Sequence, residues 1–147
     1  MVVGATGELL GSRRQELVTP LDVLPTLAEW FGHADLVRAF SDDEACSLGP
    51  LLRSEDVNWR AEVVLQDDEG NAALRTDEFL FVVNVAEPLA TANPVDLSAQ
   101  EDSLFLKPED VWEVNDVAEQ HPDHVVALRT TLTDRLRSRC SRPPHAG

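Results

Sequence analysis

The chain has 147 residues, of which 43% are hydrophobic and 27% charged, a composition typical of a globular domain. Its 27 acidic residues outnumber its 12 basic residues and give a formal net charge of -15, which disfavours nucleic acid and anionic membrane surfaces as partners. No apolar run reaches the roughly 20 residues of a membrane-spanning helix and no signal peptide opens the sequence, so the chain as written is expected to be cytoplasmic.

The segment from Thr19 to Gly32 predicts a helix that buries one face. Leu24, Leu27, Ala28 and Phe31 recur at the i, i+3, i+4, i+7 spacing of a helical stripe, and glycine commonly follows a helix end. The segment has prolines at positions 20 and 25, and proline is tolerated in a helix only within its first turn. We therefore expect a loose opening turn from Thr19 and regular helix from about residue 23, with a further helical turn in residues 33–40.

Three strand-like runs follow: Ala61 to Gln66, Asn71 to Thr76 and Phe79 to Asn84. The first two are separated by a turn at 67–70, whose glycine suits positive φ. The third run is apolar on both faces and is expected to be central, with the other two nearer an edge. Residues 86–102 show no period and predict irregular surface chain.

The last predicted helix begins at Pro122, because proline is favoured at the first helical position. Val125, Leu128, Leu132 and Leu136 form its apolar stripe. Residues 141–147 are expected to be a disordered tail.

Three strings in this order resemble segments of type I sulfatases, which are arylsulfatase-like enzymes of the alkaline phosphatase superfamily. The first, V-T-P-L-D-V-L-P-T-L-A-E-W-F-G, runs from Val18 to Gly32, and the second, E-A-C-S-L-G-P-L-L-R-S-E-D-V-N-W-R, from Glu44 to Arg60. The third, L-F-L-K-P-E-D-V-W-E-V-N-D-V-A, runs from Leu104 to Ala118, with Val111 where the family most often has proline. Together they span most of the chain.

The resemblance implies an α+β fold: a small antiparallel sheet of about four strands packed by the C-terminal helix, preceded by a helix left over from the sulfatase α/β domain. Residues 1–45 would be a remnant of that catalytic domain, 46–140 the C-terminal subdomain and 141–147 the tail. Trp112 is expected on or near the last strand, buried against the last helix. Trp30 and Trp59 are expected to be core or interface anchors.

In the family, sulfate esters are hydrolysed by a formylglycine made from the cysteine of C-x-P-S-R, together with calcium. Both groups belong to segments N-terminal to those resembled here. Cys46 and Cys140 lie outside such a motif and outside any C-x-x-C spacing, so neither is assigned as nucleophile and only a disulfide between them stays open. We assign no catalytic, cofactor-binding or metal-binding residue, and Cys46 is expected to pack as a small half-buried side chain.

The remaining polar clusters have structural interpretations. His121 and His124, with Asp116, Glu119 and Asp123, surround a helix start, where polar groups satisfy free N–H groups more often than they bind metal. Asp67, Asp68 and Glu69 lack the spacing of a calcium loop and predict a solvated turn. Glu113, Asn115 and Asp116 are expected to cap and bond the backbone between the sheet and the last helix.

The sequence thus predicts the C-terminal region of a sulfatase-like sulfuric ester hydrolase without independent catalytic activity, so that its status as an enzyme stays uncertain. The alternative is a non-catalytic binding or assembly module derived from that subdomain. The small sheet cannot cover Leu24, Leu27 and Phe31 as well as the last helix, so part of that stripe is expected to be exposed. The expected partners are an upstream sulfatase catalytic segment or a second copy of the chain, with neither nucleic acid nor membrane.

Overall fold

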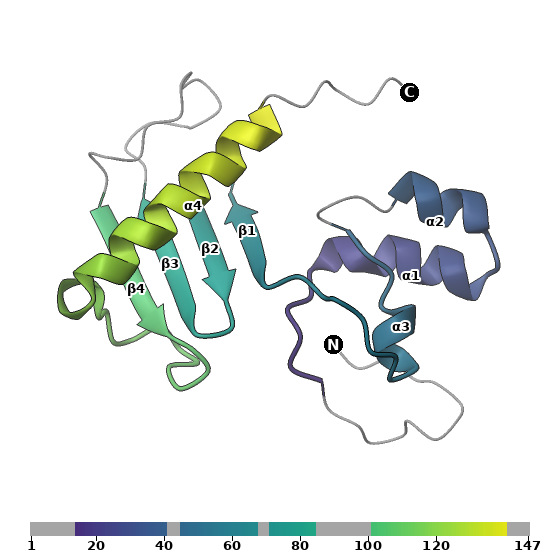
Figure 1. Cartoon of the computed structure of the whole chain (residues 1–147), viewed down its shortest axis with the longest axis horizontal. Helices are drawn as coiled ribbons and strands as arrows, with labels where there is room; N and C mark the ends of the chain where they lie inside the picture. The colour runs from purple at the N-terminus through teal and green to yellow at the C-terminus, as the bar shows by residue number, and fades with distance from the viewer. Residues whose placement is uncertain (1–13, 41–44, 68–70, 85–100, 141–147) are drawn as a thin grey trace. The chain divides into compact units, whose positions relative to one another are not determined.

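A computed structural model describes residues 14–40, 45–67, 71–84 and 101–140 (Figure 1). Contacts divide the chain into two compact units, Met1–Val63 and Val64–Gly147, which we call the helical unit and the sheet unit and describe separately. The predicted division after residue 45 followed the family's segments and stays a prediction. The expected turn at 68–70, the tail from 141 and most of the loop at 86–102 lie outside the described residues.

The helical unit contains a 3-10 turn and three short helices. The turn η1 covers Pro20–Asp22 and is followed by α1 (Val23–Trp30), α2 (Ala34–Phe40) and α3 (Gly49–Leu52). The predicted loose opening turn and the start of regular helix at residue 23 are both confirmed. Gly32 ends α1 at φ +74°, a conformation that glycine adopts without a steric cost, and the chain then turns into α2.

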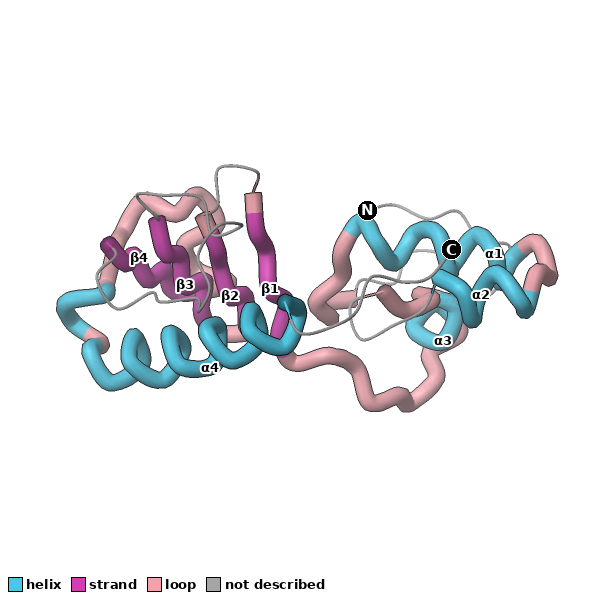
Figure 2. Tube along the Cα trace, turned by 90° about the horizontal axis from the view of Figure 1, so that it is seen from above, coloured by secondary structure: helices cyan, strands magenta, loops and turns pink. Residues whose placement is uncertain are grey.

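The sheet unit has the expected four strands and a covering helix. β1 (Glu62–Gln66), β2 (Ala72–Thr76), β3 (Phe79–Asn84) and β4 (Glu101–Leu106) lie in the order β1-β2-β3-β4, and β3 pairs antiparallel with both β2 and β4. After the 3-10 turn η3 (Ala118–Gln120), helix α4 (Pro122–Cys140) lies along one face of the sheet (Figure 2). The predicted α+β class and the start of the last helix at Pro122 are confirmed.

Alternation of side chains along the strands builds the core of the sheet unit. Phe81 is aligned with Leu74 on one neighbouring strand and with Leu104 on the other, and all three are fully buried. Leu132 and Leu136 of α4 join the same cluster, and Val125 and Leu128 pack partly against it, as the predicted stripe requires. Burial of this row of apolar side chains is the main force that holds α4 on the sheet.

Two expectations about the strands need correction. β3 is central as predicted, but β2 is also an inner strand, because β1 covers its other edge. The stretch read as irregular up to residue 102 ends earlier, since Glu101 and Asp102 already pair with Asn84 and Val83 in the ladder. Their polar side chains hid the beginning of β4 from a pattern based on hydrophobicity.

The orientation of α1 differs from the simple expectation that its apolar stripe is buried. Of that stripe only Ala28 is buried, whereas Leu24, Leu27 and Phe31 are 54%, 39% and 74% exposed. The inward side carries Pro25 and Thr26 instead. The further expectation that part of the stripe lies exposed is therefore confirmed.

Candidate functional site

Asp22 is a polar side chain of the helical unit that is 0% exposed and accepts several hydrogen bonds. Its Oδ2 accepts a hydrogen bond from the backbone N–H of Thr19 at 2.7 Å, which closes the opening turn as a capping box. Its Oδ1 accepts the backbone N–H of Cys46 at 2.8 Å and a guanidinium N–H of Arg60 at 2.6 Å. One carboxylate thus joins three segments that are far apart in sequence.

Thr26, one turn after Asp22, continues the same inward side of α1. Its hydroxyl donates to the backbone oxygen of Asp22 and accepts the backbone N–H of Leu48 at 2.8 Å. Thr26 therefore links the first turn of α1 to the backbone at the start of α3.

Glu29 is the third member of this row. Its carboxylate accepts the hydroxyl of Ser47 and an N–H of Arg53, the latter at 2.6 Å. The Ser47 hydrogen bond, followed by Arg53, holds the pKa of Glu29 below its ordinary value in spite of the opposing effect of burial. Gly49 lies against this carboxylate: a Cβ there would stand 2.4 Å from its oxygens, so a larger residue would push Glu29 aside.

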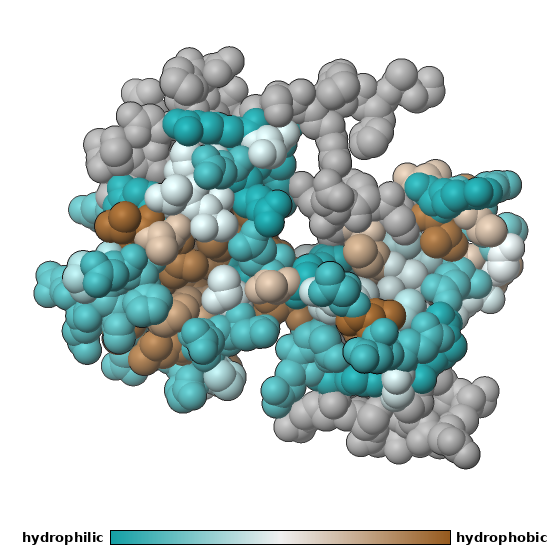
Figure 3. Space-filling view, in the orientation of Figure 1, coloured by the Kyte–Doolittle hydropathy of each residue, from teal (hydrophilic) through white to brown (hydrophobic). Residues whose placement is uncertain are grey.

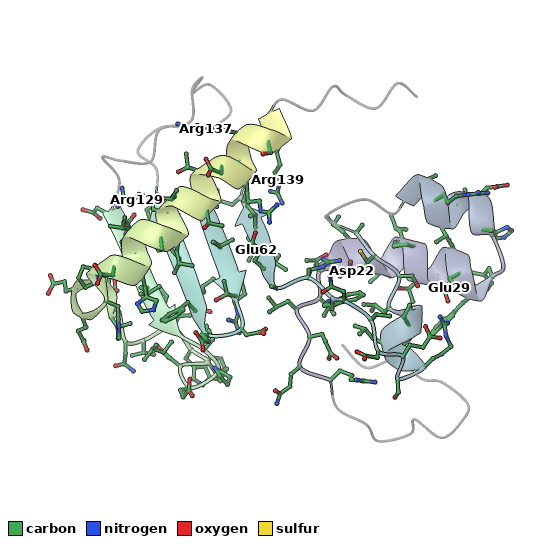
Figure 4. The ribbon with its side chains drawn as sticks, viewed as in Figure 1. Asp22, Glu29, Glu62, Arg129, Arg137 and Arg139 are labelled. Atoms are coloured by element: carbon green, nitrogen blue, oxygen red, sulfur yellow. The ribbon has the colours of Figure 1, made fainter. Side chains whose placement is uncertain are left out.

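We call Asp22, Thr26 and Glu29, with the groups that they bind, the polar clamp; Figure 4 labels its two acidic members. The clamp fastens residues 45–60 to α1, and the Trp59 indole N–H adds a bond to the Leu17 oxygen at 2.7 Å. Trp59 is half-buried, as an anchor should be, whereas Trp30 is 48% exposed. Sequence reasoning missed Thr26, Glu29 and Ser47, although the i, i+4, i+7 spacing of the row from Asp22 was a usable signal.

In the sheet unit the chain leaves β4 in a bonded loop from Lys107 to Asp116. The largely buried ammonium group of Lys107 donates to the Glu113 carboxylate at 2.9 Å and to the Asp110 backbone oxygen at 2.6 Å. Asp110 in turn accepts the backbone N–H groups of Asn115 and Val114, and these bonds lower its pKa. The loop is thus fixed largely by its own polar groups.

Trp112 lies in this loop and is 85% exposed, so the prediction that it is buried between sheet and helix is wrong. The strand ends at Leu106, and the backbone N–H of Asp110 already bonds to the oxygen of that residue in a turn. Trp112 therefore follows the sheet instead of belonging to it. Val111 and Val114 are exposed beside it.

Asp116 has the structural role predicted for the Glu113–Asp116 cluster. Its Oδ1 accepts the backbone N–H of Leu104 in β4 at 3.1 Å and that of Ala118 in η3 at 2.9 Å. Burial raises the pKa of this carboxyl, but the bonds from Ala118, Leu104 and Ser103 outweigh it, and the pKa is lowered. Asp116 therefore ties the last strand to the turn that leads into α4.

The two histidines at the start of α4 contact an aromatic ring. His124 and Phe79 have ring centroids 4.9 Å apart, and those of His121 and His124 are 5.7 Å apart. In the part of the chain that the structure describes, no three His, Cys, Asp or Glu side chains are grouped to hold a metal ion. The expected packing role of Cys46 agrees with its half-buried position; the side chain of Cys140 lies outside the described residues.

The polar side chains of these sites bond to backbone groups and to one another. The acceptor atoms of the clamp bind N–H groups, hydroxyls or guanidinium groups of the same chain. One shallow hollow in the helical unit, of about 460 Å3, is lined by Glu29, Gly32, Ala34, Val37 and Arg38. None of the helices described is both long and apolar enough to cross a membrane.

Comparison with known proteins gives matches only among solved structures: no family model and no curated relative matches the chain. The protein BT4656, solved in complex with its substrate D-glucosamine-2-N,6-O-disulfate, matches with a TM-score of 0.55 and 16% identity over 86% of this chain and 25% of its own. Bacteroides fragilis yidJ, which is named as a sulfatase, matches with a TM-score of 0.52 and 18% identity over 78% of this chain and 24% of its own.

At these identities the comparisons establish a shared fold, and they do so over about a quarter of each solved chain. The resemblance seen in the sequence is thereby confirmed at the level of the fold.

Proposed function

We propose that this chain is the C-terminal region of a sulfatase-like sulfuric ester hydrolase and has no independent catalytic activity. The observation that carries the proposal is the polar clamp, because it joins the first two sulfatase-like strings to each other. Asp22, in the first string, bonds the backbone of Cys46 and the side chain of Arg60, both in the second. The two sulfatase-like strings are therefore bonded to each other in the folded chain, as adjoining parts of one structure are.

The chain lacks the chemical groups that would give it independent activity. Sulfate-ester hydrolysis of this kind needs a nucleophile made in a C-x-P-S-R motif, whereas the two cysteines stand in A-C-S-L-G and C-S-R-P-P. The clamp oxygens are held by bonds to the chain itself, so they offer no general base. A catalytic segment with the formylglycine and the calcium ligands would have to supply both groups.

The test is hydrolysis of 4-nitrophenyl sulfate and of D-glucosamine-2-N,6-O-disulfate by the purified 147-residue chain, with and without added calcium. BT4656, whose substrate the second compound is, serves as the positive control under the same conditions. We expect no turnover above buffer for this chain. Turnover that persists after Cys46→Ala with Cys140→Ala would overturn the proposal, since it would require a nucleophile of another kind.

The alternative, a non-catalytic assembly module, is favoured by one observation: α1 directs its apolar side chains outward. The DNA upstream of the codon for Met1 separates the two hypotheses. An in-frame C-x-P-S-R motif followed by a segment with acidic metal ligands is expected for a sulfatase region. A stop codon close to Met1 without such a segment would favour the module.

A further inference from the structure

Helix α1 differs from an ordinary surface helix in that its polar side faces inward and its apolar side faces outward. Its inward side holds the polar clamp, whereas Leu24, Leu27, Trp30 and Phe31, which we call the α1 apolar face, are 39% to 74% exposed. At about 100° per residue these four side chains fall within an arc of about 120°. They therefore form one surface and not scattered apolar residues, which would need no explanation.

Three of the four residues of the α1 apolar face, Leu24, Leu27 and Phe31, are spaced nearly evenly along the helix. The midpoint between Leu24 and Phe31 in the sequence falls just after Leu27. Two such helices that pack antiparallel about a two-fold axis at this point bring Leu24 of each copy beside Phe31 of the other, with the Leu27 side chains at the centre. A face of this kind is self-complementary, as an isologous interface requires.

Charge does not oppose such a contact at this place, although the chain as a whole carries -15. Glu29 is the only charged residue of α1, and it is bonded to Arg53 on the inward side of the helix. The acidic excess therefore lies elsewhere in the chain, where it acts at longer range and is screened by salt.

From these observations we propose that the α1 apolar face binds the same face of a second copy of this chain. A standard interface buries about 800 Å2 per partner around an apolar core with a polar rim. Half-exposed leucines and aromatic residues of this number present on the order of 400 Å2, which is sufficient for that core. Leu21 and Leu36, also exposed, extend the apolar surface of the unit; Figure 3 shows hydrophobic patches among the hydrophilic surface of both units. The proposal goes beyond the proposed function, under which an upstream catalytic segment is the other candidate occupant of this face.

The test is sedimentation of the full chain over a range of concentrations. It compares the wild type with Leu24→Glu/Phe31→Glu, which alters the two most exposed members of the face. The wild type is expected to dimerise reversibly, and the variant to raise the dimer dissociation constant on the order of 100-fold. Trp112→Glu is the matched control, because it places a charge at an exposed aromatic position of the sheet unit; it should leave the dissociation constant unchanged.

Salt gives a second readout, which separates an association through apolar side chains from one held by ion pairs. Raising NaCl from about 0.01 M to about 1 M shortens the Debye length from about 30 Å to about 3 Å. It should therefore tighten a dimer held by an apolar face between acidic chains. Circular dichroism of the double variant checks that its helices persist.

Three results would overturn the proposal: a wild-type monomer at every concentration and salt, a dimer that the double variant leaves intact, or a dimer that Trp112→Glu dissociates. A monomer whose α1 amides are strongly protected from hydrogen exchange would show that another segment of the same chain covers the face. A dimer that weakens with salt would show that ion pairs hold it.

Discussion

The two units of this chain are stabilised in opposite ways. The sheet unit buries a row of apolar side chains between strands and α4, and its polar groups lie around that core. The helical unit buries a carboxylate, a hydroxyl and an ion pair against one side of α1 and leaves large apolar side chains outside. Burial of apolar surface stabilises a unit directly, whereas a buried ion pair roughly offsets its own desolvation and mainly fixes one geometry.

The contrast explains why the helical unit is sensitive to single polar groups. Replacing a buried carboxylate that accepts several hydrogen bonds lowers the free energy of unfolding, because each donor loses its partner and cannot reach water. We therefore expect the sheet unit to respond to changes in side-chain volume and the helical unit to changes in charge. Four predictions, from the largest effect to the smallest, test this difference.

Phe81→Ala should destabilise the sheet unit by about 4 kcal/mol, because the fully buried ring contacts both neighbouring strands and leaves a cavity. Hydrogen exchange of the β2, β3 and α4 amides measures the loss. Val126→Ala is the control, since Val126 is exposed on α4 and its truncation should change little. Unchanged protection in Phe81→Ala would contradict the assigned core.

Asp22→Asn should destabilise the helical unit by about 3 kcal/mol, because it removes the buried charge that pairs with the largely buried Arg60 guanidinium. Fluorescence of Trp59 during urea unfolding, in a background that lacks the other two tryptophans, follows this unit. The matched control is Asp35→Asn, which makes the same chemical change in the exposed pair with Arg38 and should cost less than about 0.5 kcal/mol. Equal effects of the two changes would refute the clamp.

Asp116→Asn should cost about 1 kcal/mol at neutral pH, because a neutral amide oxygen can still accept both backbone bonds but more weakly. The pKa of Asp116 is lowered in the folded state, so its contribution is present above the unfolded value of about 3.9 and is lost as pH falls through the folded value.

The difference in unfolding free energy between wild type and Asp116→Asn should therefore shrink below about pH 4. Burial raises the pKa of Asp102, which changes the acid response in the opposite direction in both proteins. The charge of Asp116 is the smallest contributor to that rise, so most of this response cancels in the comparison. A difference that grows as the pH falls would contradict the assigned bonds.

Trp112→Ala should change the midpoint of urea unfolding by less than the equivalent of about 0.5 kcal/mol, because the side chain is exposed in a loop held by other residues. The sequence alone favoured a buried tryptophan, whose truncation typically costs about 3 to 5 kcal/mol. A loss of that size would show that Trp112 is buried and would contradict its exposed position.

Most elements of this fold can be predicted from local patterns in the sequence. Short strand-like runs indicated β1 to β3, proline placed the starts of η1 and α4, and the stripe through Leu132 and Leu136 identified the buried face of α4. These predictions are correct because they depend on local sequence patterns, which each element shows in its own residues. The capping role of Asp116 could be predicted from its position shortly before the last helix.

Which face of α1 turns inward, and where Trp112 lies, depend on contacts between segments that are distant in sequence. The period of α1 separates an apolar face from a polar row, but the choice between them depends on the donors that residues 45–60 bring to Asp22, Thr26 and Glu29. Trp112 has apolar neighbours in sequence, but its side chain is exposed because β4 ends at Leu106, before it. A periodic pattern fixes which side chains share a face, whereas their burial is a property of the partner that meets that face.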